Sequence, residues 1–190
     1  EGMEGLRYGK LENGLTYYVK HSKAEPGRVS FYLLQNVGSI LEEDHENGLA
    51  HFLEHKMFED EDGDAFAKFA KTGANANAFT AFDRTCYLFT ATEQLDESLD
   101  VLLGMVGRPY FTEQTIAKEQ GIIGQEIKMY DDSPDWRLIT GLCECLYHSH
   151  PIRSDIAGTV ESIAEITPGM LYDCCRAFYA PVSYTHLRAH

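Results

Sequence analysis

The chain has 190 residues, of which 44% are hydrophobic and 24% charged, and this composition indicates a globular protein with a core. Its formal net charge of −14, from 16 basic and 30 acidic residues, argues against nucleic acid and anionic membrane surfaces as partners, because both attract Lys and Arg. No run approaches the roughly 18–20 apolar residues of a membrane-spanning helix. The five cysteines, an odd number with adjacent pairs, do not indicate a disulfide framework, so we expect a reducing compartment, the cytoplasm.

Up to residue 92 the sequence predicts mainly strands. The predicted elements are, in chain order, strands over residues 15–19 and 28–37, helices over about 48–58 and 64–71, and strands over 74–80 and 85–92. The turn signal Asn13-Gly14 precedes the first strand, and Gly73 closes the second helix. The run over 28–37 is apolar enough for a central strand.

The second half of the sequence predicts mainly helices. They cover residues 95–106, 113–130, 136–146 and 168–179. Thr112 is a suitable N-cap for the second of these, and Thr167 followed by Pro168 starts the last. We therefore predict an α+β fold, in which a mixed or antiparallel sheet carries helices packed on one face.

One segment, His51-Phe52-Leu53-Glu54-His55, has the spacing of a metal site. At about 100° per residue, positions i, i+3 and i+4 share one face of a helix, so His51, Glu54 and His55 lie together. Two imidazoles one turn apart can bind one zinc ion, and the glutamate can take a proton from a water there. The alternative is a surface helix with solvated histidines. The apolar neighbours Leu49, Phe52, Leu53 and Met57 favour a packed helix instead.

A third ligand is expected from the helix over residues 113–130. Glu119 and Glu126 are two helical turns apart and so share a face. We expect apolar neighbours to crowd that face, namely Ile116, Ile122, Ile123 and Met129. A carboxylate in such surroundings loses hydration unless a positive group compensates, and a divalent cation does so. The alternative is a solvated glutamate stripe on an amphipathic helix.

These motifs resemble those of the insulinase/pitrilysin family of zinc metallopeptidases. His51-x-x-Glu54-His55 is the inverted zinc motif of the inverzincins, and Glu119-x6-Glu126 is similar to the family's distal pair. The surrounding segments GLAHFLEHKMFE, GANANAFTAFDRTCYLF and KEQGIIGQEIKMYDDSPDWR resemble a bacterial branch of the family. The resemblance implies zinc ligation by His51, His55 and Glu126. It also implies that Glu54 is the general base and that Glu119 orients a ligand histidine.

The resemblance also implies how a substrate binds and what happens to it. In the family a peptide adds as a strand to a sheet edge beside the metal, and Asn77-Ala78-Phe79-Thr80 matches that edge. Asn77 and Ala78 would then contact the substrate main chain, unless this is an ordinary edge strand. The implied activity is a zinc endopeptidase that hydrolyses short or unfolded peptides. The alternatives are a non-catalytic peptide-binding or assembly subunit, and an accessory factor in protein modification.

The resemblance covers only the first half of a two-part protein. It implies a peptidase N-terminal domain over residues 1–181, whose partner is a homologous C-terminal half or a paralogous subunit. Without that partner we expect zinc binding but no useful turnover. Residues 182–190 do not continue the family pattern, and we expect them to be a non-native tail that packs poorly and leaves the sheet one strand short.

Overall fold

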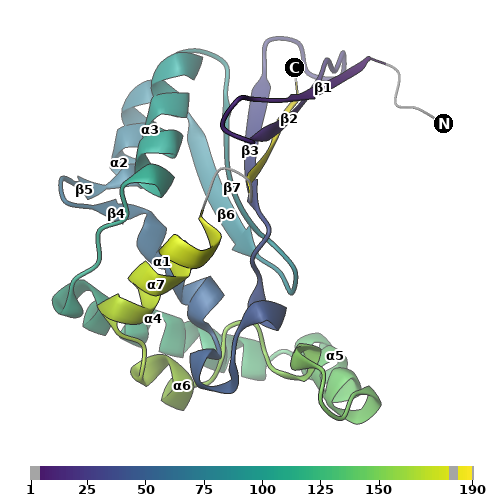
Figure 1. Cartoon of the computed structure of the whole chain (residues 1–190), viewed down its shortest axis with the longest axis vertical. Helices are drawn as coiled ribbons and strands as arrows, with labels where there is room; N and C mark the ends of the chain where they lie inside the picture. Colours follow the sequence, from purple (N-terminus) through teal and green to yellow (C-terminus); the bar gives the residue numbers. More distant parts are fainter. Residues whose placement is uncertain (1–4, 180–183, 190) are drawn as a thin grey trace.

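A computed structural model describes residues 5–179 and 184–189, and its centre is a six-stranded sheet (Figure 1). The strands of this sheet are, in chain order, β1 (Leu6–Lys10), β2 (Thr16–Lys20), β3 (Val29–Gln35), β6 (Asn75–Thr80), β7 (Thr85–Ala91) and β8 (Tyr184–Ala189). Their order across the sheet is β1-β2-β8-β3-β7-β6, with β2 and β8 parallel and the other neighbours antiparallel. A separate hairpin consists of β4 (Glu59–Asp60) and β5 (Gly63–Asp64). Among the described strands, β6 is therefore one edge of the sheet.

Seven α-helices and three short 3-10 helices are described. The α-helices are α1 (Leu49–Met57), α2 (Ala65–Thr72), α3 (Leu95–Gly107), α4 (Glu113–Asp131), α5 (Pro134–Leu146), α6 (Val160–Ala164) and α7 (Pro168–Phe178). The 3-10 helices are η1 (Ser39–Leu41), η2 (Asp44–Glu46) and η3 (Pro151–Arg153). Figure 1 shows α1, α2, α3 and α7 on the same side of the sheet, with α5 projecting at one end of the molecule. Within the described ranges no helix is both long and apolar enough to cross a bilayer.

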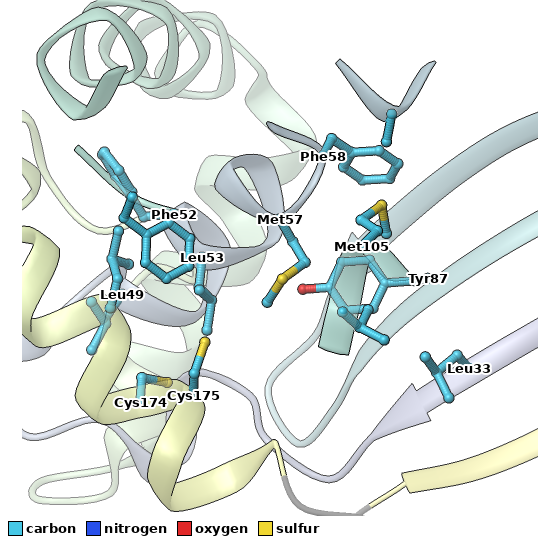
Figure 2. Close-up of a cluster of buried hydrophobic side chains, with 14 of the residues drawn as sticks. Leu33, Leu49, Phe52, Leu53, Met57, Phe58, Tyr87, Met105, Cys174 and Cys175 are labelled. Carbon is cyan, nitrogen blue, oxygen red and sulfur yellow. The ribbon is translucent and has the colours of Figure 1, made fainter. Parts of the chain in front are cut away.

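The core lies between the sheet and helix α1. Side chains of β3 alternate between buried and half-buried, as expected for a strand with one face on the core. Figure 2 shows Phe52 and Leu53 of α1 close to Cys174 and Cys175 of α7. Tyr87 of β7 packs on the other side of α1, with none of its surface exposed. Helix α1 contacts β6, β7, α4 and α7, so it is held from several directions.

Most predicted elements are confirmed to within about two residues at each end. The run over 28–37 is central as expected, because β3 lies between β8 and β7. Thr112 caps α4 through its side chain, Thr167 caps α7, and Gly73 ends α2 in the left-handed conformation. Strand β1 and helix α6 were not predicted, since β1 has little buried surface and α6 has only five residues. The α+β prediction with a mixed sheet is confirmed.

The expectation of a sheet one strand short is wrong. Strand β8 lies between β2 and β3 and pairs with both. The physical reason is that ladder hydrogen bonds join main chains and do not depend on side chains, so an extended segment of almost any sequence can fill this position. Residues 182, 183 and 190 lie outside the described residues, and the non-native origin of the tail stays a prediction.

Candidate metal centre

Helix α1 carries three of the predicted site residues on one face. His51, Glu54 and His55 lie at positions i, i+3 and i+4, and the first two are buried. The apolar neighbours predicted to pack, Leu49, Phe52, Leu53 and Met57, are all at most 3% exposed. The helix is thus an internal one, and the alternative of a surface helix with solvated histidines is wrong.

The structure brings Glu126 of α4 to the two histidines. The Nε2 atom of His51 lies 3.7 Å from Oε1 of Glu126, and Nε2 of His55 lies 3.4 Å from Oε2 of the same carboxylate. The imidazole rings meet edge to face with centroids 4.6 Å apart. One possible ligand atom from each of the three residues lies within 4.8 Å of the other two. Glu126 lies at least 71 positions after either histidine in the sequence, and the fold brings all three residues to one point.

Glu119 occupies a different place from Glu126. Its Oε1 atom lies 2.9 Å from Nδ1 of His55, on the side of the ring that faces away from Glu126. Because Nδ1 donates a proton to this carboxylate, Nε2 of His55 is the nitrogen that would bind a cation, and the cation would displace the proton that this nitrogen carries without it. Glu119 is buried, whereas the side chain of Glu126 is 23% exposed. One glutamate of the pair orients a histidine, and the other faces the point where the donors meet.

The apolar surroundings of this pair differ in part from the prediction. Ile116 and Ile123 are buried as expected, but Ile122 and Met129 are 45% and 62% exposed. The prediction failed for these two because they point away from the side of α4 that packs on α1 and α6. The burial of Glu119 comes from its contact with α1, and the alternative of a solvated glutamate stripe fails for this residue.

The cluster has strongly perturbed acid–base properties. Burial lowers the pKa of His55, but hydrogen bonds to Glu119 and Glu126 outweigh it and raise that pKa to about 10. Burial and the neighbouring His55 together lower the pKa of His51 to about 4. Contact with His55 lowers the pKa of Glu126. Two carboxylates thus hold a positive charge at this point, which is the electrostatic setting that favours a cation.

The donor set and spacing fit a zinc ion. Zinc accepts imidazole nitrogen and carboxylate oxygen at about 2.0–2.2 Å, so two ligand atoms in a tetrahedral arrangement lie about 3.4 Å apart. Nε2 of His51 lies 3.7 Å from Oε1 of Glu126 and Nε2 of His55 lies 3.4 Å from its Oε2, so each histidine is close to that spacing from one oxygen of the carboxylate. Three protein donors leave a fourth position open, as in catalytic rather than structural zinc sites.

Glu54 lies next to this centre and is held by a residue of β6. The Oγ1 atom of Thr80 donates a hydrogen bond of 2.6 Å to Oε2 of Glu54. Burial raises the pKa of Glu54, although the hydrogen bond from Thr80 opposes the shift. A raised pKa makes a carboxylate a stronger base, which suits a group that takes a proton and returns it. Thr80 received no role in the sequence prediction, although it belongs to the segment assigned to the substrate edge.

A cavity of about 650 Å³ opens beside the three donors and Glu54. Its lining includes β6 and the turn after it, with Ala78, Phe79 and Thr80. It also includes Tyr130 of α4, Trp136 of α5 and the loop that contains Asp155. Trp136 Nε1 donates a hydrogen bond of 2.7 Å to Asp155, which fixes this wall. A single tryptophan in a helical pattern suggests a core position, and nothing in the sequence distinguishes it from a cavity wall.

A second cavity, of about 330 Å³, also borders His55 and Glu54. Asn77 and Ala78 both border it, together with Phe58, Phe66 and Glu119. Ala78 therefore borders both cavities, whereas Asn77 borders only the smaller one. In the described sheet β6 pairs only with β7, so its outer edge has no neighbouring strand, and Ala78 on β6 borders both cavities.

Comparison with known proteins gives a consistent picture. A family model described as Insulinase (Peptidase family M16) matches residues 13–160. The chain is 50% identical over 188 residues to the uncharacterized zinc protease YmfH of Bacillus subtilis, which covers 94% of this chain and 44% of that protein. An M16-like peptidase from Alicyclobacillus acidocaldarius has a similar structure, with a TM-score of 0.90 and 38% identity, covering 97% of this chain and 45% of that one. The structure of the first half of the Escherichia coli periplasmic protease PqqL gives a TM-score of 0.89 at 26% identity. This match covers 98% of this chain and 42% of that one. The chain therefore spans less than half the length of these relatives.

Proposed function

Since the chain belongs to the insulinase family, peptidase family M16, we propose that it carries the catalytic zinc site of an endopeptidase. His51, His55 and Glu126 would hold the zinc ion. The observation that carries this proposal is the convergence of three donor atoms from α1 and α4 within 4.8 Å, with two separations close to those of tetrahedral ligands. Relatives described as zinc proteases support the identity of the metal.

In this proposal the residues around the metal have different roles in hydrolysis. Zinc, when bound, lowers the pKa of water and polarises a carbonyl group. Glu54 would take the proton of the attacking water and return it to the leaving amine, for which its raised pKa is suitable. Thr80 holds the carboxylate of Glu54 in place, and Glu119 holds the ring of His55.

The substrate would be an extended peptide that adds to the edge of β6. Its main chain would pair with the segment that includes Asn77 and Ala78, and its side chains would enter the two cavities that border His55. Backbone pairing requires an unfolded or short peptide, because a folded protein seldom presents a free strand. The carboxamide of Asn77 is exposed and available to such a strand, although its oxygen accepts a hydrogen bond from the amide of Ala78.

A second homologous half would complete the enzyme. The relatives are more than twice as long as this chain, which implies such a half. Helix α5 supports this, because none of its residues is buried and it exposes apolar side chains at helical spacing, namely Leu138, Ile139, Leu142 and Leu146. All five cysteines are free, and we propose the cytoplasm as the compartment. For the chain alone we expect zinc binding without efficient turnover.

The experiment that tests this function combines metal analysis with a quenched-fluorescence peptide assay. It compares wild type, Glu54→Gln and His51→Ala, each with and without the second half. We expect Glu54→Gln to keep its zinc and to lose at least about 100-fold in turnover, as for other general bases. His51→Ala should lose both zinc binding and turnover. Unchanged hydrolysis by Glu54→Gln would refute the assigned base, and a wild type that binds zinc and peptide but never cleaves would favour a binding subunit.

A further inference from the structure

The start of helix α1 is bound by a carboxylate from outside the helix. Oε2 of Glu42 accepts a hydrogen bond of 3.0 Å from the amide of Gly48, and Oε1 accepts one of 2.8 Å from the amide of Ala50. Glu42 follows η1, six residues before the helix cap. A single side chain thus binds two main-chain N–H groups immediately before His51.

The helix needs this partner because it cannot use an ordinary side-chain cap. Its N-cap is Gly48, which has φ of +92° and no side chain. A Cβ atom at Gly48 would lie 2.6 Å from the carbonyl oxygen of Ala157, so there is no room for serine, threonine or aspartate. The first N–H groups of a helix have no partners within the helix, and at a buried end they must find acceptors elsewhere. Glu42 supplies two.

The two histidine ligands differ in how they are held. His55 is fixed through its side chain, because Nδ1 bonds to Glu119. The Nδ1 atom of His51 is buried and has no hydrogen-bond partner in the described structure. His51 is also the third residue of α1, within the first turn, where helices fray most readily. Its position therefore depends on the main chain of that turn.

We propose that Glu42 is a positioning residue for His51, which sets the metal affinity of the site through the first turn of α1. The inference rests on the zinc site proposed above. It is supported by the position of Glu42 itself. Desolvation raises the pKa of this half-buried carboxyl to about 7 in spite of its two backbone hydrogen bonds, so the fold holds the acid where its charged form is disfavoured.

The adjacent glutamate provides a matched control. Glu43 carries the same side chain one position later, but its side chain is 77% exposed and it caps η2 instead of α1. The experiment measures zinc affinity by chelator competition for wild type, Glu42→Ala, Glu42→Gln and Glu43→Ala, at a temperature where circular dichroism shows each to be folded. Imidazole NMR signals of His51 and His55 are recorded in the zinc-loaded proteins.

We expect Glu42→Ala to weaken zinc binding about 10- to 100-fold, in the range found for residues that hold metal ligands in place. Glu42→Gln should bind with intermediate affinity because its amide oxygen still accepts one hydrogen bond, and Glu43→Ala should stay within about twofold of wild type. The NMR signal of His51 should shift or broaden in Glu42→Ala, while that of His55 stays as in wild type.

Each contrary result has a distinct meaning. Equal zinc affinity of folded Glu42→Ala and wild type would overturn the positioning role while leaving the zinc site intact. Equal disturbance of His51 and His55 would also overturn it, since that indicates general unfolding. If Glu42→Ala does not fold, the zinc affinity and the histidine NMR signals of Glu42→Gln are compared with those of Glu43→Gln, and the same criteria apply. A wild type that binds no zinc would refute the proposed metal site itself, and this inference with it.

Discussion

The Nδ1 atom of His55 lies 2.9 Å from Oε1 of Glu119, and this contact joins helix α1 to helix α4 directly behind the metal centre. It fixes both the orientation of the ring and the nitrogen that carries the proton. Since α1 and α4 each carry proposed ligands, the same contact also holds the separation of these ligands. Glu119 therefore acts on the site through His55, without itself facing the converging donors.

Substitution of Glu119 should weaken metal binding without removing a ligand. We expect Glu119→Ala to raise the zinc dissociation constant about 10- to 100-fold, because His55 loses the acceptor that fixes its ring. Glu119→Gln should weaken zinc binding less than Glu119→Ala, since its amide oxygen can still accept a hydrogen bond from Nδ1. Chelator competition measures both. The control is Glu113→Ala, an exposed glutamate in the first turn of the same helix. A loss of equal size in the control would show that general damage to α4 is responsible.

The ligand-bearing helices could be predicted from sequence because their signals are local. The limits of α1 and α4 agree with the prediction to within about one residue, since apolar spacing and the Thr112 cap act within the helix itself. The pairing of His51 and His55 follows from helix geometry alone. The closeness of Glu126 does not, because it depends on how two helices pack, and it was expected from the family resemblance.

The residues that hold the proposed catalytic groups could not be assigned from sequence. Thr80 and Glu54 are 26 positions apart and meet only because β6 packs against α1. Glu42 lies in an acidic stretch whose composition suggests solvated side chains, whereas the fold leaves it half-buried and bonded to the start of α1. In both cases the role comes from a long-range contact that no short pattern encodes.

Removal of the Thr80 hydroxyl should destabilise the fold through Glu54. Thr80→Val keeps the shape and the strand preference of the side chain, but leaves a buried carboxylate without its donor. We expect a loss of about 1–3 kcal/mol in the free energy of unfolding, measured by urea denaturation. The same change should raise the pKa of Glu54 further, since the hydrogen bond from Thr80 lowers it. Thr80→Ser retains the hydroxyl and should stay near wild type. If serine destabilises as much as valine, packing of the methyl group explains the loss.

Glu42 should make the stability of the chain depend on pH. Burial raises its pKa from 4.5 to about 7 on folding, so between these values the folded state binds more protons than the unfolded state. The free energy of unfolding should therefore fall as pH rises from about 4.5 to about 7. At about 1.4 kcal/mol for each pKa unit, the contribution of Glu42 is on the order of 3 kcal/mol.

The test compares variants, because other groups titrate in the same range. Urea denaturation at several pH values between 4.5 and 7.5 should show that Glu42→Gln gains stability relative to wild type as pH rises. Glu43→Gln removes the same charge at an exposed position and should follow the slope of wild type. A constant difference between Glu42→Gln and wild type at all pH values would show that the carboxyl of Glu42 titrates alike in both states.

Two glycines with similar backbone angles should respond differently to alanine. Gly48 and Gly27 have φ of +92° and +80°, so alanine at either position costs about 1–2 kcal/mol in backbone strain. At Gly27 an added Cβ meets nothing within 4 Å, whereas at Gly48 it would lie 2.6 Å from the carbonyl oxygen of Ala157. That oxygen belongs to main chain bordering the larger cavity and cannot move as an isolated side chain would.

We therefore expect Gly48→Ala to destabilise the fold by about 1–3 kcal/mol more than Gly27→Ala, which is the typical cost of overpacking. Urea denaturation of the two variants measures the difference. Gly48→Ala should also weaken zinc binding, because relief of the clash must shift either the first turn of α1 or the cavity wall at Ala157. Equal losses of stability in the two variants would show that the contact between Gly48 and Ala157 relaxes freely, and the start of α1 would then be less firmly held than its contacts indicate.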